Sequence, residues 1–479
     1  MIDTQAIRNK ILDLAMRGKL TEQLPGDGTA EELYEQIQAE KQELIKAGRI
    51  KKEKPMSDIP PEDVPFPLPN SWKWVYLGEL FQHNTGKALN ARDRQGQILD
   101  YITTSNLYWD HFELDELKQM PFTEAEIEKC TVKKGDLLVC EGGDIGRSAI
   151  WPFDYDMRIQ NHIHRLRRYS SSICTEFYYY VLWFYKQTGR IKGIGIGLQG
   201  FSSKRVHSLV VPFTPYKEAD RIVEKIRKAF SILDTIDSLQ TQYADNLTAL
   251  KAKLIDAAIQ GKLTEQLPED GTAEELYRQI QAEKQALIKA GKIKKEKPLP
   301  EITVDEIPFE IPENWKWCRL LDLCKSVSDG DHQAPPQVKE GIPFLVISNV
   351  SKGFIDLTDV RHVPFDYYNS LSYERTAEQG DVLFTVTGSF GIPVIVDTGE
   401  KFCFQRHMAL LKPLIDTAYL HHALQSGYVQ KKCDDIAIGT AQRTVGIKQL
   451  RIIPIPLPPL EEQRRISERL ERLFSTLEQ

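Results

Sequence analysis

The sequence Gly18-Lys-Leu-Thr-Glu-Gln-Leu-Pro25 returns unchanged as Gly261-Lys-Leu-Thr-Glu-Gln-Leu-Pro268. The match continues for 38 positions, of which 34 are identical. The offset of 243 residues holds without a gap from Lys10 to Trp72-Lys-Trp74, whose copy is Trp315-Lys-Trp317. A repeat of this length indicates a tandem duplication, in which each copy leads from a helix to a Trp-x-Trp that opens the next domain.

Beyond the Trp pair the identity falls sharply, but a skeleton of short motifs persists. The pairs are Thr104-Ser-Asn106 with Ile347-Ser-Asn349, Lys134-Gly-Asp136 with Gln379-Gly-Asp381, and Gly143-Asp-Ile-Gly146 with Gly388-Ser-Phe-Gly391. The surrounding segments are rich in Val, Ile, Phe and Tyr and are broken by Gly and Pro, which predicts short strands joined by turns. We therefore expect an α+β chain with two strand-rich domains in pseudo-twofold tandem. One scaffold with two different faces is typical of modules that meet two different targets.

The overall composition is that of a folded protein with more than one core. The chain has 479 residues, of which 41% are hydrophobic and 27% are charged, and its net charge is -6. Its apolar runs are shorter than the ~20 residues that span a bilayer, and its first residues do not resemble a secretory signal, so we expect a cytoplasmic protein. The seven cysteines include no C-x-x-C pair, which argues against a disulfide framework and a zinc site.

A heptad pattern runs from Ile222 to Ala257 and predicts one long helix. The C-terminal segment from Arg465 resembles the start of this helix, and the N-terminal segment resembles its end. We therefore expect the two terminal helices to imitate the central helix and to form with it a long antiparallel coiled-coil bundle that separates the modules. The residues expected at this helical partner interface are Ile222, Ile226, Leu233, Ile236, Gln240, Tyr243, Leu247, Leu250 and Leu254, with Ile7, Ile11, Ile466, Leu470 and Leu473 from the termini.

Each copy of the repeat also contains an insert that we expect to be helical. The inserts run from Thr29 to Gly48 and from Thr272 to Gly291; each starts with a capping box and ends with a glycine. Two interpretations are open: a helix packed on its own domain, or a surface for another subunit that is the same in both copies.

The sequence lacks the motifs of a self-contained enzyme. It has no Asn/Asp-Pro-Pro-Tyr segment of the kind that holds a flipped base and no phosphate-binding P-loop. The pair His162-x-His164 is better explained by structural histidines than by a metal site, because no third ligand is evident. We therefore expect no catalytic residues and no metal in this chain.

Basic side chains cluster in two segments about half a chain apart, which fits binding to nucleic acid. Residues 140–210 carry ten Lys or Arg against five Asp or Glu, and residues 401–451 carry eight against three. Arg, Lys, Asn and Gln neutralise phosphates and read base edges in the major groove. The candidate DNA-binding residues are Lys87, Arg92, Arg94, Arg147, Arg158, Lys204, Arg205, His332, Gln333, Arg406, Lys431, Lys432, Arg443 and Lys448.

The second module ends in Ile453-Pro-Ile-Pro-Leu-Pro-Pro-Leu-Glu-Glu-Gln463, an exit sequence that leads from the module into the C-terminal helix. Together with the duplication, this exit sequence makes the chain resemble the specificity (S) subunit of type I restriction-modification systems. The first module exits through Val211-Pro-Phe-Thr-Pro-Tyr-Lys-Glu218, which keeps the helix start but loses the double proline. The resemblance implies a helical region at 1–70, a target-recognition domain at 71–213, a central helical region at 214–313, a second target-recognition domain at 314–456 and a C-terminal helix at 457–479.

The same resemblance implies a non-catalytic subunit whose two halves each read one half of a bipartite asymmetric DNA site. The implied partners are double-stranded DNA, two modification (methyltransferase) subunits, which would hold S-adenosylmethionine and methylate adenine, and the restriction (motor-nuclease) subunits. This chain would carry no cofactor itself. Two alternatives remain: a coiled-coil assembly scaffold without DNA recognition, and the recognition subunit of a differently organised methylation system.

Overall fold

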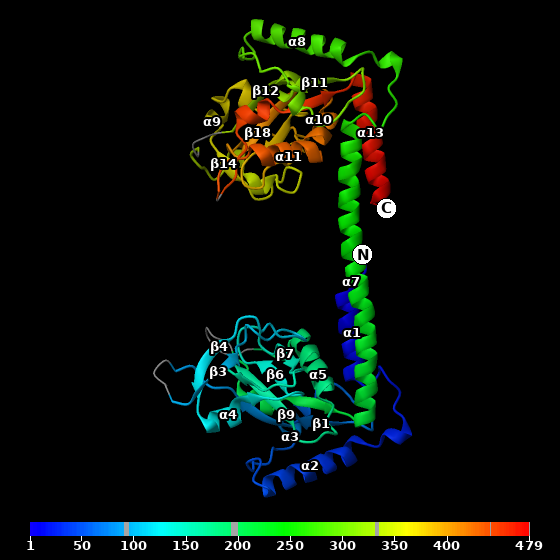
Figure 1. Cartoon of the computed structure of the whole chain (residues 1–479), viewed down its shortest axis with the longest axis vertical. Coiled ribbons are helices and arrows are strands. Elements are labelled where there is room, and N and C mark those ends of the chain that lie inside the picture. Colours follow the sequence, from blue (N-terminus) through cyan, green and yellow to red (C-terminus); the bar gives the residue numbers. More distant parts are fainter. Residues whose placement is uncertain (91–94, 193–199, 331–334, 441, 479) are drawn as a thin grey trace. The chain divides into compact units, whose positions relative to one another are not determined.

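The computed structural model consists of two compact units, Met1–Thr241 and Gln242–Gln479 (Figure 1). It describes residues 1–90, 95–192, 200–330, 335–440 and 442–478. The 44-residue helix α7 (Tyr216–Ile259) contributes its first part to one unit and its last part to the other. Among the described residues, no helix has the length and apolar character needed to cross a membrane.

The first unit combines two N-terminal helices, a strand-rich module and the start of α7. Its helices are α1 (Thr4–Met16), α2 (Ala30–Lys46), α3 (Leu77–Leu80), α4 (Glu124–Cys130), α5 (Thr175–Gln187) and α6 (Ser203–His207). Its strands are β1 (Lys73–Tyr76), β2 (Phe81–Thr85), β3 (Gln97–Ile102), β4 (Lys118–Phe122), β5 (Thr131–Val132), β6 (Leu137–Cys140), β7 (Ser148–Ile150), β8 (Met157–Ile159), β9 (Ile163–Arg168) and β10 (Val210–Phe213).

The second unit contains the end of α7, a second insert helix, a second strand-rich module and the C-terminal helix. Its helices are α8 (Ala273–Lys289), α9 (Phe365–Asn369), α10 (Thr417–Gln425), α11 (Gly427–Ile436), α12 (Ile447–Arg451) and α13 (Leu460–Leu477). Its strands are β11 (Lys316–Arg319), β12 (Cys324–Asp329), β13 (Ile342–Leu345), β14 (Arg361–Val363), β15 (Val382–Thr385), β16 (Pro393–Ile395), β17 (Cys403–Phe404), β18 (Met408–Pro413) and β19 (Pro454–Leu457).

The two modules share most of their strand topology, and the smaller sheet of the first module has one additional strand, β5. The larger sheet has the order β2-β9-β6-β7 in the first module and β12-β18-β15-β16 in the second. The smaller sheet places β3 between β4 and β8, and β13 in the same way between β14 and β17. A two-stranded ribbon, β1-β10 or β11-β19, joins the entry of each module to its exit. The expectation of an α+β chain with two strand-rich domains is therefore confirmed.

The shared motifs form turns and loop anchors in both modules. Gly143-Asp-Ile-Gly146 and Gly388-Ser-Phe-Gly391 connect β6 to β7 and β15 to β16, and all four of their glycines have a positive φ, which glycine adopts without strain. Asn106 Nδ2 donates to the carbonyl oxygens seven and ten residues further on, and Asn349 Nδ2 does the same. These motifs therefore belong to the scaffold, which explains why both halves keep them.

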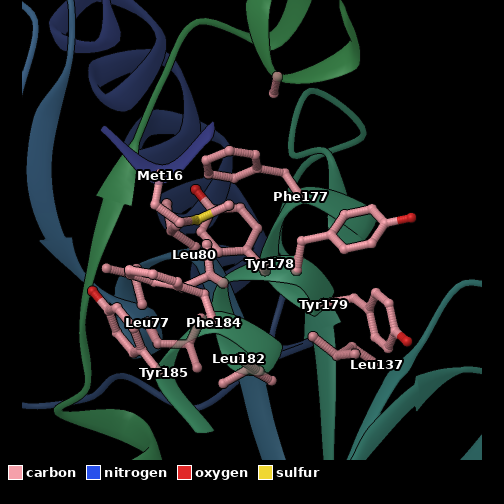
Figure 2. Packing of buried hydrophobic residues seen from close by; sticks show 14 of the residues in the cluster. Met16, Leu77, Leu80, Leu137, Phe177, Tyr178, Tyr179, Leu182, Phe184 and Tyr185 are labelled. Carbon is pink, nitrogen blue, oxygen red and sulfur yellow. The ribbon is translucent and has the colours of Figure 1, made fainter. Parts of the chain in front are cut away.

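Aromatic side chains of α5 build much of the core of the first unit. Figure 2 shows Phe177, Tyr178, Phe184 and Tyr185 packed together with Leu77 and Leu80 of α3 and with Met16 of α1. The same core extends to Ile222, Ile226 and Leu233 of α7. Because helices and module share one core, the start of α7 is fixed to the module that it follows.

In each unit, the helix that follows the module lies beside the helix that precedes the insert. These helices are α7 and α1 in the first unit, and α13 and α7 in the second. In the first unit, Thr4 Oγ1 donates to Asp237, and Arg8 Nη2 donates to Asp234 and Asp237, so α1 contacts the first part of α7. In the second unit, Lys251 in the last part of α7 pairs with Glu478, just past the end of α13. The coiled-coil bundle expected to include all three helices stays a prediction.

Only part of the predicted heptad seam is buried. Ile222, Ile226, Leu233, Ile466 and Leu470 are buried, whereas Ile11, Ile236, Gln240, Leu247, Leu254 and Leu473 are half-buried. Tyr243 is 61% exposed, Leu250 is 42% exposed and Ile7 is 40% exposed. The expected helical partner therefore covers only the ends of the seam within each unit.

Both insert helices pack on their own module. The capping boxes Thr29–Glu32 and Thr272–Glu275 start α2 and α8 as expected. Lys41 Nζ donates to the Gly78 carbonyl oxygen, and Lys284 Nζ donates to that of Leu321. The outward faces of both helices are exposed, so a second role in binding another subunit stays a prediction.

A buried glutamate connects the entry of each module to its exit and to the repeat. The Glu462 carboxylate accepts hydrogen bonds from Trp315 Nε1 at 2.9 Å, Gln266 Nε2 at 2.8 Å and Thr264 Oγ1 at 3.0 Å. In the first unit, Glu218 accepts from the corresponding residues Trp72, Gln23 and Thr21. Each junction therefore uses residues of the Lys-Leu-Thr-Glu-Gln repeat, the Trp-x-Trp and the exit sequence.

We predict that Glu462→Ala strongly destabilises the second unit. Trp315 Nε1 would lose its acceptor in a buried position, and a buried polar group left unsatisfied costs about 1–3 kcal/mol, so we expect the free energy of unfolding to fall by about that amount. The matched control is Glu461→Ala, since Glu461 is exposed and pairs only with Arg464 among the contacts of the described chain. Chemical denaturation of both variants measures the difference, and equal losses would contradict the role of the buried carboxylate.

Candidate nucleic-acid interface

A polar cleft lies in the second module where β12, the ends of β15 and β18 and helix α12 meet. Its volume is about 590 Å³. It is lined by Asp329, Val386, Thr387, Arg406, His407, Gln442, Thr444, Val445, Gly446, Ile447, Lys448 and Gln449. Two of the predicted DNA-binding residues, Arg406 and Lys448, therefore come together in one place.

Backbone hydrogen bonds hold the three segments of this cleft together. The Val386 N–H donates to the carbonyl oxygen of His407, and the Val445 N–H donates to that of Val386. The Gly388 N–H donates to the carbonyl oxygen of Arg443. Arg406 and Lys448 thus project from a framework that is fixed without their side chains, which leaves their charged groups available to a ligand.

The first module has the same framework at the same place. The Glu141 N–H donates to the carbonyl oxygen of His162, and the Phe201 N–H donates to that of Glu141. By this correspondence α6 matches α12 and Lys204 matches Lys448, while Arg205 stands where the second module has Gln449. Lys204 is exposed; Arg205 Nη1 donates to the Lys192 carbonyl oxygen and lies over the Phe201 ring.

The two modules differ in a histidine pair near α6, in which His164 is buried and His83 is half-buried. His83 Nε2 lies 3.0 Å from His164 Nδ1, and His164 Nε2 donates to the Phe201 carbonyl oxygen at 2.6 Å. Because His164 uses its proton on Nε2, the proton between the rings belongs to His83. The strand registers place Val327 and Ala409 at the corresponding positions of the second module. His164 is thus a hydrogen-bonded structural residue, as expected, while His162 lies in the turn before β9 and is half exposed.

Burial keeps both rings of this pair neutral. Desolvation lowers the pKa of His83 to about 3, with a further contribution from the nearby His164. Desolvation also lowers the pKa of His164 to about 4. Since the unfolded chain takes up protons near the ordinary value of 6.5, the stability that these rings contribute is complete above pH 6.5 and is lost as the pH falls toward 4.

We therefore predict that a His83→Val, His164→Ala variant, which copies the second module, loses less stability on acidification than the wild type. Between pH 7 and pH 5 the free energy of unfolding of the wild type should fall by on the order of 2 kcal/mol more than that of the variant for each of the two histidines. Denaturant unfolding at the two pH values measures this difference. His162→Ala should keep the wild-type pH dependence, and a double variant with that same dependence would show that the pair does not resist protonation.

Several other predicted residues serve the scaffold. Lys87 is only 8% exposed, and its ammonium group donates to Glu126 and to the Pro121 carbonyl oxygen, so its expected DNA contact is disfavoured by its burial. Arg147 Nη2 donates to the Thr104 carbonyl oxygen, and Arg158 Nε donates to that of Asp100. Long cationic side chains in these small modules satisfy loop carbonyl groups, a role that their sequence does not distinguish from DNA contact.

The remaining candidates lie near the surface of the second module or outside the described residues. Lys431 is exposed, Lys432 lies over the Tyr428 ring, and Arg443 pairs with Asp434. Arg92, Arg94, His332 and Gln333 lie outside the described residues. The cleft also contains His407, Gln442 and Gln449, which are not among the predicted residues. Gln405-Arg-His407 matches Gln160-Asn-His162 of the first module, and this match is the sequence signal for the turn that carries His407.

Comparisons with known proteins agree with the duplicated architecture. The family model described as "Type I restriction modification DNA specificity domain" matches residues 69–248 and again residues 312–479. The chain is 28% identical over 548 aligned positions to the Escherichia coli type I restriction enzyme EcoAI specificity subunit, covering 98% of this chain and 89% of that protein. It is also 28% identical to the Escherichia coli EcoEI specificity subunit, over 99% of this chain and 89% of that protein.

A solved structure has the same fold. A chain from a study of complex assembly and conformational transition in a type I R-M system matches with a TM-score of 0.58 at 20% identity. The match covers 86% of this chain and 92% of that chain. At this identity the likeness concerns the fold alone.

Proposed function

Because the chain belongs to the family of type I restriction-modification DNA specificity domains, we propose that each of its two modules reads one half of a bipartite, asymmetric DNA site. The observation that carries this proposal is the pair of corresponding surfaces. One backbone framework presents Lys204 and Arg205 in the first module and Lys448 and Gln449 in the second. Equal scaffolds with unequal base-reading side chains fit two unequal half-sites.

The second-module cleft offers the chemistry needed to distinguish bases. Arginine and lysine donate to guanine, and glutamine pairs with adenine in the major groove. Arg406, Lys448, Gln442 and Gln449 bring both kinds of side chain to one polar cleft. Phosphate contacts by the exposed cations would set the register, while the amide groups would contribute selectivity.

The proposal includes the expected assembly. The chain would act without catalytic residues of its own and would recruit two modification subunits, which hold S-adenosylmethionine, and the restriction subunits. The half-exposed and exposed positions of the heptad seam, Ile7, Tyr243 and Leu250, would be covered by an antiparallel coiled-coil bundle or by these partners. Recognition domains at 71–213 and 314–456 are supported by the ribbons β1-β10 and β11-β19, which join the ends of each module.

The deciding experiment combines the chain with its modification subunit. DNA exposed to this complex would be sequenced by a long-read method that detects methylated adenine. A two-part asymmetric motif is expected, and a salt-dependent, sequence-selective mobility shift should accompany it. Absence of selective DNA binding in a stable complex would favour a scaffold without DNA recognition.

A further inference from the structure

Each insert helix is followed by a short, strongly basic segment. Residues 46–54 contain five Lys or Arg and one Glu, and residues 289–297 have the same composition. Both end in Lys-Lys-Glu-Lys, at Lys51–Lys54 and Lys294–Lys297, and all six of these lysines are exposed. Each unit therefore has three exposed cations in this segment, and none of the six lysines lines the cleft described above.

The single glutamate of each segment lies near the last residue of the module helix that carries the predicted DNA contact. Glu53 Oε2 lies 3.9 Å from Nε2 of His207, the last residue of α6. Glu296 Oε1 lies 3.3 Å from Nη1 of Arg451, the last residue of α12. His207 and Arg451 each follow Lys204 or Lys448 by three residues, which is about one helical turn. The glutamate therefore lies at the same place in both units, although its neighbour is a histidine in the first and an arginine in the second.

The glutamates and the lysines of both segments are exposed, but each glutamate has a cation close to it that offsets its charge. In the first unit Glu53 is also held by Lys41 Nζ at 3.1 Å, so a buried cation of α2 helps to neutralise it. In the second unit Lys294 Nζ lies 3.5 Å from Glu374, but its side chain is 79% exposed, and an ion pair of this kind is worth little in water. The net result is a local excess of positive charge beside α6 and beside α12.

We propose that these two segments bind the phosphate backbone of double-stranded DNA next to each half-site. The inference rests on the proposed function and extends it to six lysines: Lys51, Lys52 and Lys54 in the first unit, and Lys294, Lys295 and Lys297 in the second. Their contact is independent of base sequence, because an ammonium group on a flexible stem recognises a phosphate as a point charge.

The identity of the two segments fits this ligand, as it also fits a partner protein that meets both units. Residues 46–54 and 289–297 differ only at Arg49 and Lys292, which carry the same charge, whereas the modules beside them have diverged. A surface that reads bases must differ when the half-sites differ, but phosphates are the same at every site. A backbone contact can therefore stay identical in both copies while the base-reading clefts change.

The test uses the complex of the chain with its modification subunit and two duplexes that carry the recognised site. One duplex extends about one helical turn beyond the site on each side, and the other is trimmed to the site. For Lys51→Gln, Lys52→Gln, Lys54→Gln, the slope of log affinity against log salt on the long duplex should shrink by up to about 2.7, since each lost phosphate contact removes about 0.9. On the trimmed duplex the slope should equal that of the wild type, and the motif should be unchanged on both.

Two further variants sharpen this test. Replacing the same three lysines by arginine should retain the slope, because the charge remains. The matched control, Lys129→Gln, Lys133→Gln, Lys134→Gln, removes three exposed charges before β6, at the far end of that strand from Glu141, and should also retain it. The equivalent triple change at Lys294, Lys295 and Lys297 should act in the same direction.

Three results would overturn the inference. The first is an equal slope for wild type and the glutamine triple on the long duplex. The second is loss of the modification subunit from the glutamine triple, which would identify the segment as a protein interface. The third is a wild-type complex without sequence-selective binding, which would refute the proposed function and this extension of it together.

Discussion

A chain that carries the second module in both positions should methylate a motif whose two halves have the same base sequence. In this variant residues 316–457 replace residues 73–213. Both exchange points lie at the ends of the ribbons, where Lys73 pairs with Phe213 and Lys316 pairs with Leu457. The buried junction of Trp72 and Glu218 stays outside the exchanged segment, so the incoming module meets the same helices as the one it replaces.

We expect one half-site of the methylated motif to be replaced completely and the other half-site to be unchanged. If base readout lies within the modules, the half-site that belonged to the first module disappears and the remaining half-site appears twice. Long-read sequencing of methylated DNA after co-expression with the modification subunit measures this. The reciprocal chain, with residues 73–213 in both positions, is the control and should give the other half-site twice. Retention of the original asymmetric motif in a folded, active variant would show that the modules do not carry the specificity.

The scaffold could be predicted from the sequence because the duplication shows each structural motif in two copies. The Trp-x-Trp and the Lys-Leu-Thr-Glu-Gln repeat occur in both copies, and the structure joins them at corresponding glutamates, Glu218 and Glu462. The first exit lacks the double proline of the second, yet it keeps the glutamate. Hydrogen bonding to the donors of the junction requires that one carboxylate side chain, which explains why both exits keep it.

The DNA contacts of the candidate site stay predictions, because charge alone does not reveal where a side chain points. Lys87, Arg147 and Arg158 are as basic as Lys204 and Lys448, but their donors satisfy Glu126 or loop carbonyl groups. Burial of a polar backbone group requires a partner, and a long cation can reach one from a distance. The pairing of His83 with His164 was likewise hidden, because the two residues are 81 positions apart in the chain.

The heptad pattern predicts secondary structure well but does not predict which of its residues are buried. Spacing correctly predicted that α7 is one long helix, because a regular apolar period fits only one secondary structure. The same spacing gave every seam position equal weight, yet Leu233 is buried and Tyr243 is mostly exposed. Burial depends on which helix lies opposite each residue, and that information lies in tertiary contacts rather than in the period.

Arg406→Ala combined with Lys448→Ala should weaken the binding of the complex to its specific DNA by about 30-fold or more. The two cations line the polar cleft of the second module, and loss of a base or phosphate contact costs about 1–3 kcal/mol each. The two possible roles give different signatures. A base contact would relax selectivity in the second half-site only, whereas a phosphate contact would weaken binding to all sequences and reduce the salt slope by about one for each residue.

The matched control replaces two exposed lysines of the same unit, Lys352 and Lys401, which are not among the residues that line the cleft. This control has the same change in charge and should bind within a few-fold of the wild type. Lys204→Ala with Arg205→Ala tests the corresponding surface of the first module and should affect the first half-site instead. Because α6 and α12 occupy the same place in one framework, the two double variants should act on opposite halves of the motif. A variant of the second module that altered the first half-site would contradict independent reading by the two modules.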